Sequence, residues 1–72
     1  MKFLVIIEKG PNNLSAYLPD LPGCVSTGRD REEVLRNIRE AVEGHLEVMR
    51  EYGDEMPVPL SEADQIEVAV GV

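Results

Sequence analysis

Few residues in this sequence are of types that do chemistry, and they lie far apart along the chain. There is one cysteine, Cys24, and one histidine, His45, against 14 aspartates and glutamates. A nucleophilic thiol needs a neighbouring base or cation to lower its pKa, and Cys24 has no histidine, lysine or second cysteine beside it in sequence. A structural zinc centre usually takes several thiolates. We therefore expect Cys24 to be a buried apolar residue.

The carboxylates are also poorly placed for metal-dependent nuclease chemistry. Such a site needs several Asp or Glu side chains converging from strand centres and a helix. The only acidic residue in the first three predicted strands is Glu8, and the acidic residues of the predicted helix alternate with arginines. A phosphate-binding glycine loop is missing too, since PGCVSTGRD holds no lysine. We therefore predict no catalytic residue, no cofactor and no metal.

The most distinctive loop is YLPDLPGC, residues 17–24. Its two prolines fix φ, and Gly23 can adopt positive φ. Asp20 can accept hydrogen bonds from backbone amides, as aspartates in turns often do. Leu21 either fills the core or is exposed. The sequence favours a rigid corner between two strands, with a partner-contact surface on that corner as the second interpretation.

Four strands and one helix must position these residues. Residues 2–8, KFLVIIE, predict a strand whose two faces are both apolar. Residues 14–18 and 24–28 predict the second and third strands, the first two strands forming an antiparallel hairpin. Residues 65–70, QIEVAV, alternate between apolar and other residues and predict a fourth strand. Its inward side chains are Ile66, Val68 and Val70.

A helix is predicted from Arg31 to Tyr52, ending at Gly53 in the position where glycine commonly terminates helices. Asp30 is the expected N-cap, and Glu33, three residues later, completes a capping box. Apolar residues recur on one side of this helix. They are Val34, Leu35, Ile38, Ala41, Val42, Leu46, Val48, Met49 and Tyr52. His45 lies in the same stripe and is expected to be packed in the core.

The predicted fold is α+β with the order β-β-β-α-β: a small antiparallel sheet with one helix packed on one face. We expect residues 1–72 to form a single domain without a C-terminal DNA-binding domain. One helix covers only one face of a sheet. The other face stays apolar and predicts a contact surface for a homodimer or tetramer. The residues assigned to this oligomer interface are Phe3, Val5, Ile7 and Tyr17.

The net charge of −7 bears on the choice of partner. Nucleic acid phosphates would be repelled, so we expect no direct nucleic-acid binding. A basic protein partner fits this charge, although solubility alone also explains it. The apolar run FLVII has only five residues, too few for a signal peptide or a membrane helix. With a lone thiol and no export signal, a cytoplasmic location is expected.

Residues 16–59 carry these features in an order that resembles the N-terminal domain of HicB-like antitoxins. The pattern combines a hairpin ending in an aromatic residue and a proline, a DLPGC corner, a small-residue strand, an acidic helix start, a helix core and a Gly-Pro-Pro tail. Its positions here are Tyr17, Pro19, Asp20–Cys24, Gly28, Asp30, Glu32, Glu33, Asn37, Glu40, Ala41, Gly53, Pro57 and Pro59. The resemblance extends over most of the chain, from about Lys2 to Val70.

The resemblance implies a reduced RNase H-like fold without nuclease residues. It also implies oligomerisation and binding of the small basic toxin HicA, an mRNA-cleaving protein that such binding blocks. Many relatives continue into a helix-turn-helix or ribbon-helix-helix domain that binds operator DNA, and this property is not carried over.

The predicted function is that of a non-catalytic binding module that sequesters a HicA-like toxin. The expected partner-binding residues are Asp20, Leu21 and Pro22 on the corner, with Glu32 and Glu33 at the helix start. Charge complementarity would mainly speed the encounter, while apolar anchors would set the residence time. Two alternatives stay open: an orphan sensor or scaffold domain without a toxin, and a relic nuclease or hydrolase.

Overall fold

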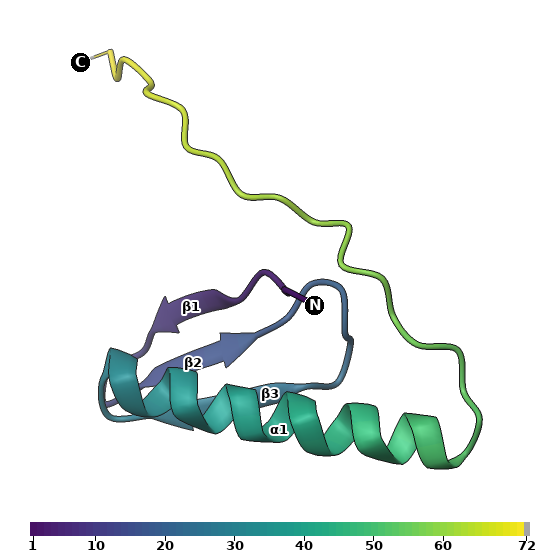
Figure 1. Cartoon of the computed structure of the whole chain (residues 1–72). Helices are drawn as coiled ribbons and strands as arrows, with labels where there is room; N and C mark the ends of the chain where they lie inside the picture. Colours follow the sequence, from purple (N-terminus) through teal and green to yellow (C-terminus); the bar gives the residue numbers. More distant parts are fainter. Residues whose placement is uncertain (72) are drawn as a thin grey trace.

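The computed structural model describes residues 1–71 and consists of a three-stranded sheet, one helix and a long C-terminal segment (Figure 1). The elements are β1 (Ile6–Lys9), β2 (Leu14–Tyr17), β3 (Val25–Gly28) and α1 (Arg31–Glu51). Both strand pairs are antiparallel and the order in the sheet is β1-β2-β3. The predicted α+β class, with an antiparallel sheet and a helix on one face, is confirmed. Val72 lies outside the described residues.

The strand register decides which side chains face the helix. Successive side chains in a strand point to opposite faces, so residues paired across the sheet form rows. The row on the helix side is Ile7, Ala16 and Ser26, and the row on the opposite face is Ile6, Tyr17 and Val25. Ala16 is fully buried, whereas Val25 is 61% exposed. The helix therefore covers one face of the sheet and leaves the other uncovered.

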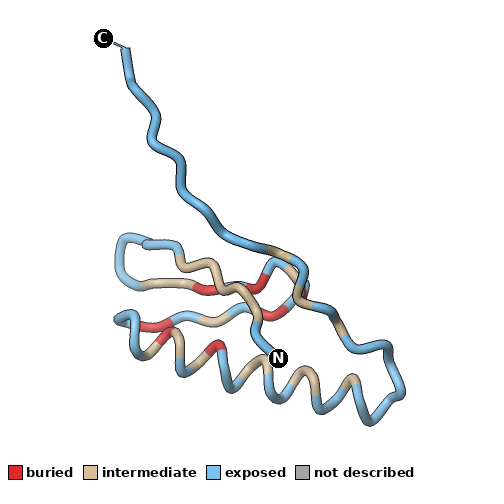
Figure 2. Tube along the Cα trace, turned by 45° about the horizontal axis from the view of Figure 1, so that its top comes forward, coloured by how far each residue is buried: buried red, intermediate tan, exposed pale blue. Residues whose placement is uncertain are grey.

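The core is small and lies between the sheet, the first half of α1 and the corner that joins β2 to β3 (Figure 2). Its members are Ala16, Leu18, Leu21, Cys24, Val34 and Ile38. The helix enters this core close to β3, where Gly28 is buried. A Cβ atom at Gly28 would lie 2.5 Å from the backbone nitrogen of Val34. Only glycine permits this close approach of strand and helix.

Both ends of α1 follow the local sequence. Asp30 is the N-cap, and its Oδ1 accepts a hydrogen bond of 2.8 Å from the backbone N–H of Glu33. Glu33 reaches back one residue further than in the usual capping box and accepts from the backbone N–H of Arg29 at 2.9 Å. At the other end, Gly53 has φ +71° and its N–H donates to the carbonyl of Arg50. The N–H of Asp54 donates to a carbonyl one residue earlier, which completes a Schellman motif.

The helix is much longer than the sheet that it covers. Its 21 residues span about 31 Å, whereas a four-residue strand spans about 13 Å. The apolar stripe therefore continues past the sheet: Val48 is 50% exposed and Tyr52 is 79% exposed. His45 is half-buried in this overhanging half. The expectation that His45 is packed in the core is therefore wrong, because this half of the helix extends past the sheet, although Leu46 and Met49 still pack against the core from its edge.

The predicted fourth strand is not part of the sheet. Residues 65–70 are extended but unpaired, and β1 pairs only with β2. After Gly53 the chain passes back over the β2–β3 corner, and from Glu62 it runs away from the domain (Figures 1 and 2). Ile66, Val68 and Val70 are 85%, 65% and 85% exposed. The alternating pattern is typical of a strand with one buried face, but no other part of the described chain covers these three side chains.

The first strand is also shorter than predicted. It begins at Ile6 instead of Lys2, because its partner strand ends at Tyr17, opposite Ile6. Leu18 already belongs to the corner, where its carbonyl accepts from the N–H of Leu21 at 3.2 Å. Residues 2–5 therefore continue beyond the paired region, beside the groove described below.

Candidate interaction surfaces

The corner between β2 and β3 is built from two consecutive turns. The N–H of Leu21 donates to the carbonyl of Leu18, and the N–H of Cys24 donates to the carbonyl of Leu21 at 3.3 Å. Gly23 has φ +86°, so Pro22 and Gly23 take the two central positions of a type II turn. Leu21 is only 3% exposed. The predicted corner between two strands is confirmed, and Leu21 fills the core instead of lying on the surface.

Asp20 holds the C-terminal segment. Its Oδ2 accepts hydrogen bonds from the N–H groups of Leu60, at 3.1 Å, and Ser61, at 2.9 Å. Its Oδ1 accepts from the hydroxyl of Ser61 at 2.9 Å. These bonds favour the charged carboxylate, so the Ser61 amide above all lowers the pKa of Asp20 below its ordinary value. No local sequence pattern indicates this contact, since the partners lie some 40 residues apart.

The acids at the helix start have different surroundings. Glu33 forms an ion pair with Arg29, with 2.9 Å between Oε2 and the guanidinium. This contact lowers the pKa of Glu33. Glu32 and Pro22 are exposed. Of the five residues predicted to bind a partner, these two are thus the most accessible, while Asp20 and Glu33 are engaged within the chain.

The residues predicted for the oligomer interface do not share one surface. Phe3, Val5 and Ile7 are half-buried and pack against the core on the helix side of the sheet. Tyr17 is 38% exposed on the opposite face, where its register partner is Ile6. The four residues thus lie on two faces of the sheet, because both faces of the first strand are apolar, and their role in an oligomer stays a prediction. The composition of that strand therefore did not reveal which face the helix covers.

The uncovered sheet face has the apolar character that the sequence predicted, but of the predicted interface residues only Tyr17 contributes to it. Ile6, Tyr17 and Val25 form a continuous row across the three strands. The neighbouring row on the same face is polar and consists of Glu8, Ser15 and Thr27. The apolar part of this face is therefore a narrow band near the corner.

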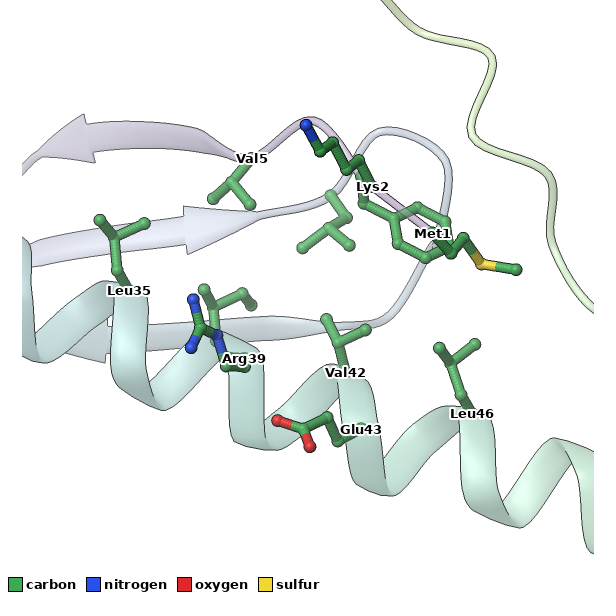
Figure 3. Close-up of a pocket in the computed structure, with 11 residues that line it drawn as sticks. Met1, Lys2, Val5, Leu35, Arg39, Val42, Glu43 and Leu46 are labelled. Atoms are coloured by element: carbon green, nitrogen blue, oxygen red, sulfur yellow. The ribbon is translucent and has the colours of Figure 1, made fainter.

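A groove of about 550 Å³ separates the N-terminal residues from the part of α1 between Leu35 and Leu46 (Figure 3). Val5 projects into it from the strand side, and Leu35, Val42 and Leu46 face it from the helix. Charged side chains lie on the rim: Lys2, Arg39 and Glu43. The groove exists because α1 contacts β2 and β3 extensively but leaves β1 without a helix above it. Sequence reasoning missed it, since it depends on where the helix crosses the sheet.

The chemically reactive residues are not gathered. Cys24 is 3% exposed, as the sequence predicted, and burial raises the pKa of its thiol. Among residues 1–71, no three His, Cys, Asp or Glu side chains lie together as a metal-binding group. No helix in this part of the chain is long and apolar enough to cross a membrane.

A sheet with one covered face, an apolar groove, an exposed C-terminal segment and an acidic surface define a small α+β domain suited to contact other chains. The family model that matches residues 3–70 is described as a HicB-like antitoxin of a bacterial toxin–antitoxin system. The chain belongs to this family, as the sequence motifs indicated.

Relatives from several sources share this similarity. The chain is 54% identical over 41 residues to a UPF0150 protein of Helicobacter pylori, a match that covers 57% of each chain. It is 34% identical over 58 residues to a UPF0150 protein of Thermoplasma acidophilum, covering 79% of this chain and 84% of that one. A 14.9 kDa protein of Haemophilus phage HP1 is 37% identical over 57 residues, which cover 79% of this chain and 43% of the phage protein. No solved structure matched the chain.

Proposed function

We propose that this chain is a non-catalytic antitoxin that binds and blocks a small basic toxin, an mRNA-cleaving protein of the HicA type. The observation that carries the proposal is the family match over residues 3–70, which covers the sheet, the helix and most of the C-terminal segment. The net charge of −7 supports a basic partner, because opposite charges steer encounter and favour the right partner over others.

The exposed acids of α1 supply the charge for this contact. They are Glu32, Glu40, Glu43, Glu47 and Glu51. We place the toxin at the start of this helix, next to the corner, where Glu32 and Pro22 are both exposed. The corner is held by its turns and by Leu21 in the core, so it offers a preformed surface that loses little conformational freedom on binding.

Calorimetric titration of the chain with the basic protein encoded beside it tests the proposal, with inhibition of the toxin's mRNA cleavage as the second readout. We expect binding that weakens as salt concentration rises. Glu32→Lys should weaken binding by about tenfold, since one close charge pair is lost and a repulsion is gained. Asp54→Lys is the matched control, because Asp54 is an equally exposed acid at the far end of the helix.

Equal effects of the two variants would place the contact elsewhere on the surface. Absence of binding and of inhibition at low salt would refute the antitoxin function. A metal-dependent cleavage of RNA by the purified chain alone would support the relic nuclease instead.

A further inference from the structure

The C-terminal segment has the alternating residue pattern of a strand, but it is exposed to solvent and pairs with no other strand. Residues 62–71 are all exposed, and their apolar side chains Ile66, Val68 and Val70 lie on one side of an extended backbone. Exposing three β-branched side chains in a row is unfavourable, since burying each one contributes about 1.5–3 kcal/mol. The segment therefore has a strong tendency to pair with an open sheet edge.

The sheet offers two edges, and they differ. At the β3 edge, the carbonyl of Thr27 already accepts a hydrogen bond of 2.8 Å from Nδ2 of Asn37, and α1 packs closely over the strand. At the β1 edge, neither the helix nor another strand covers Ile6–Lys9, which pair only with β2. Unpaired edges of this kind add strands readily.

The groove beside β1 fits the apolar side of the segment. A strand laid along the outer edge of β1 would direct every second side chain towards the helix side of the sheet. There the groove already presents Val5, Val42 and Leu46, in a volume of about 550 Å³. The aliphatic side chains of Ile66, Val68 and Val70 would fill the groove with the same kind of contact that builds the core.

Charge also favours this pairing. Residues 62–71 carry three acids, Glu62, Asp64 and Glu67, and no basic residue. Of the two lysines of the chain, Lys9 ends β1 and Lys2 precedes Ile6 by four residues. Together with Arg39 on the groove rim they supply three positive charges, against Glu8 in β1 and Glu43 on the same rim. In a protein with net charge −7, this small positive excess around β1 favours an acidic segment.

We propose that residues 65–70 of one chain add as a strand to the β1 edge of a second copy and fill its groove with Ile66, Val68 and Val70. The second copy does the same in return, so two segments exchange across a two-fold axis and each domain gains a fourth strand. Such an exchange is an inexpensive route to a dimer, because each contact forms twice.

The path of the segment favours a second copy over the segment's own domain. Asp20 binds the chain at Leu60 and Ser61, and the segment that follows runs away from its own domain (Figure 2). No glycine or proline, the residues that most readily reverse a chain, lies between Ser61 and Val70. Ten extended residues span roughly 33 Å, which is enough to cross a neighbouring domain. The proposal does not depend on the antitoxin function.

Analytical ultracentrifugation of the full chain tests the exchange. We expect a dimer at micromolar concentration, and we expect Val68→Asp to raise the dimer dissociation constant by at least about tenfold, because the variant places a charge in an apolar groove. Ala69→Asp is the matched control: it adds the same charge one residue away, on the other side of the strand. Both residues lie in the exposed segment, so neither change affects folding of the single domain.

A second measurement distinguishes exchange from closure onto the same domain. Isotope-labelled chain is mixed with unlabelled Cys24→Ala chain that carries a nitroxide on Ala69→Cys. Exchange predicts broadening of the Val5, Ile6 and Ile7 amide signals in the labelled chain. A monomer at tens of micromolar, equal dissociation constants for the two aspartate variants, or a dimer without broadening at β1 would overturn the proposal. None of these outcomes concerns toxin binding.

Discussion

At the scale of single residues, two positions connect parts of the chain that are distant in sequence. Asp20 joins the β2–β3 corner to the C-terminal segment through three hydrogen bonds. Gly28 lets β3 approach the first turn of α1 more closely than any side chain would allow. The first contact is polar and lies near the surface, and the second is steric and buried, so the two respond to different perturbations.

The Asp20 contact should depend on pH. Its pKa is lowered in the folded chain, chiefly by the Ser61 amide, so the attachment is complete above the ordinary pKa of an aspartate. It is lost as the pH falls through the lowered folded pKa. We expect the amide signal of Ser61 to titrate in this acidic range in an NMR experiment. In Asp20→Asn the titration should disappear and the amides of Leu60 and Ser61 should exchange faster at neutral pH.

The same titration in the Asp20→Asn variant would contradict this assignment, because another carboxyl would then be responsible. Glu62→Gln serves as the control, since Glu62 is exposed and adjacent to the attached residue.

The close approach at Gly28 predicts a steric effect. A methyl group there would meet the backbone of Val34 at 2.5 Å and 2.8 Å, and backbone cannot move aside as a side chain can. We expect Gly28→Ala to lower the free energy of unfolding by about 1–3 kcal/mol in urea denaturation. Gly44→Ala is the matched control, because no atom lies within 4 Å of its added methyl group. It should raise the same free energy by up to about 1 kcal/mol, since alanine favours a helix interior. Equal effects of the two changes would refute the steric account.

At the scale of elements, the helix shows what a local pattern can and cannot specify. Its start at Arg31 and its end before Gly53 were predicted from capping residues, which act on their nearest neighbours. The number of buried residues in its apolar stripe was not predicted, because that number depends on the length of the sheet beneath the helix. The buried residues Val34 and Ile38 lie over the sheet, while Val48 lies beyond it.

The strands show the same limit. Three of them were predicted from short runs of strand-forming residues between turn signals, and the hairpin of the first two followed from their short connection. The face of β1 that meets the helix was not predictable, because Ile6 and Ile7 are equally apolar and only their pairing with Tyr17 and Ala16 distinguishes them. The exposure of the predicted partner residues on the corner was not predictable for a similar reason. Leu21 is buried by tertiary packing that no spacing in the loop reveals.

The N-terminal cap should contribute measurably to the stability of α1. The Oδ1 atom of Asp30 satisfies the otherwise unpaired N–H of Glu33 at 2.8 Å. We expect Asp30→Ala to lower the free energy of unfolding by about 1 kcal/mol, the usual effect of losing an aspartate N-cap. Glu40→Ala, an exposed position in the middle of the helix, is the control and should change it by less than about 0.5 kcal/mol. A loss no greater than that of the control would show that Glu33 and Arg29 hold the helix start without Asp30.

At the scale of the whole molecule, the chain has more apolar surface than its own core can use. Six of the described residues form the buried core. Three apolar surfaces stay uncovered: the side chains of Ile66, Val68 and Val70, the groove next to the N-terminal residues, and the row of Ile6, Tyr17 and Val25. A domain of this size is marginally stable on its own core. We expect the proposed exchange to add to folding stability. The antitoxin and exchange proposals use different surfaces: the corner with the helix start, and the β1 edge.

Stability that comes from a second copy must depend on protein concentration. If two folded chains exchange strands and unfold as separate chains, mass action raises the thermal midpoint as the protein becomes more concentrated. For a chain of 72 residues we expect roughly 3–5 °C for each tenfold increase in concentration. Calorimetric scans over a hundredfold concentration range would measure the shift. In Val68→Asp the midpoint should be lower and nearly independent of concentration, while Ala69→Asp should behave as the unmodified chain does. If the unmodified chain gave one midpoint at all concentrations, the small core alone would have to account for its stability, and the exposed Ile66, Val68 and Val70 would need another partner.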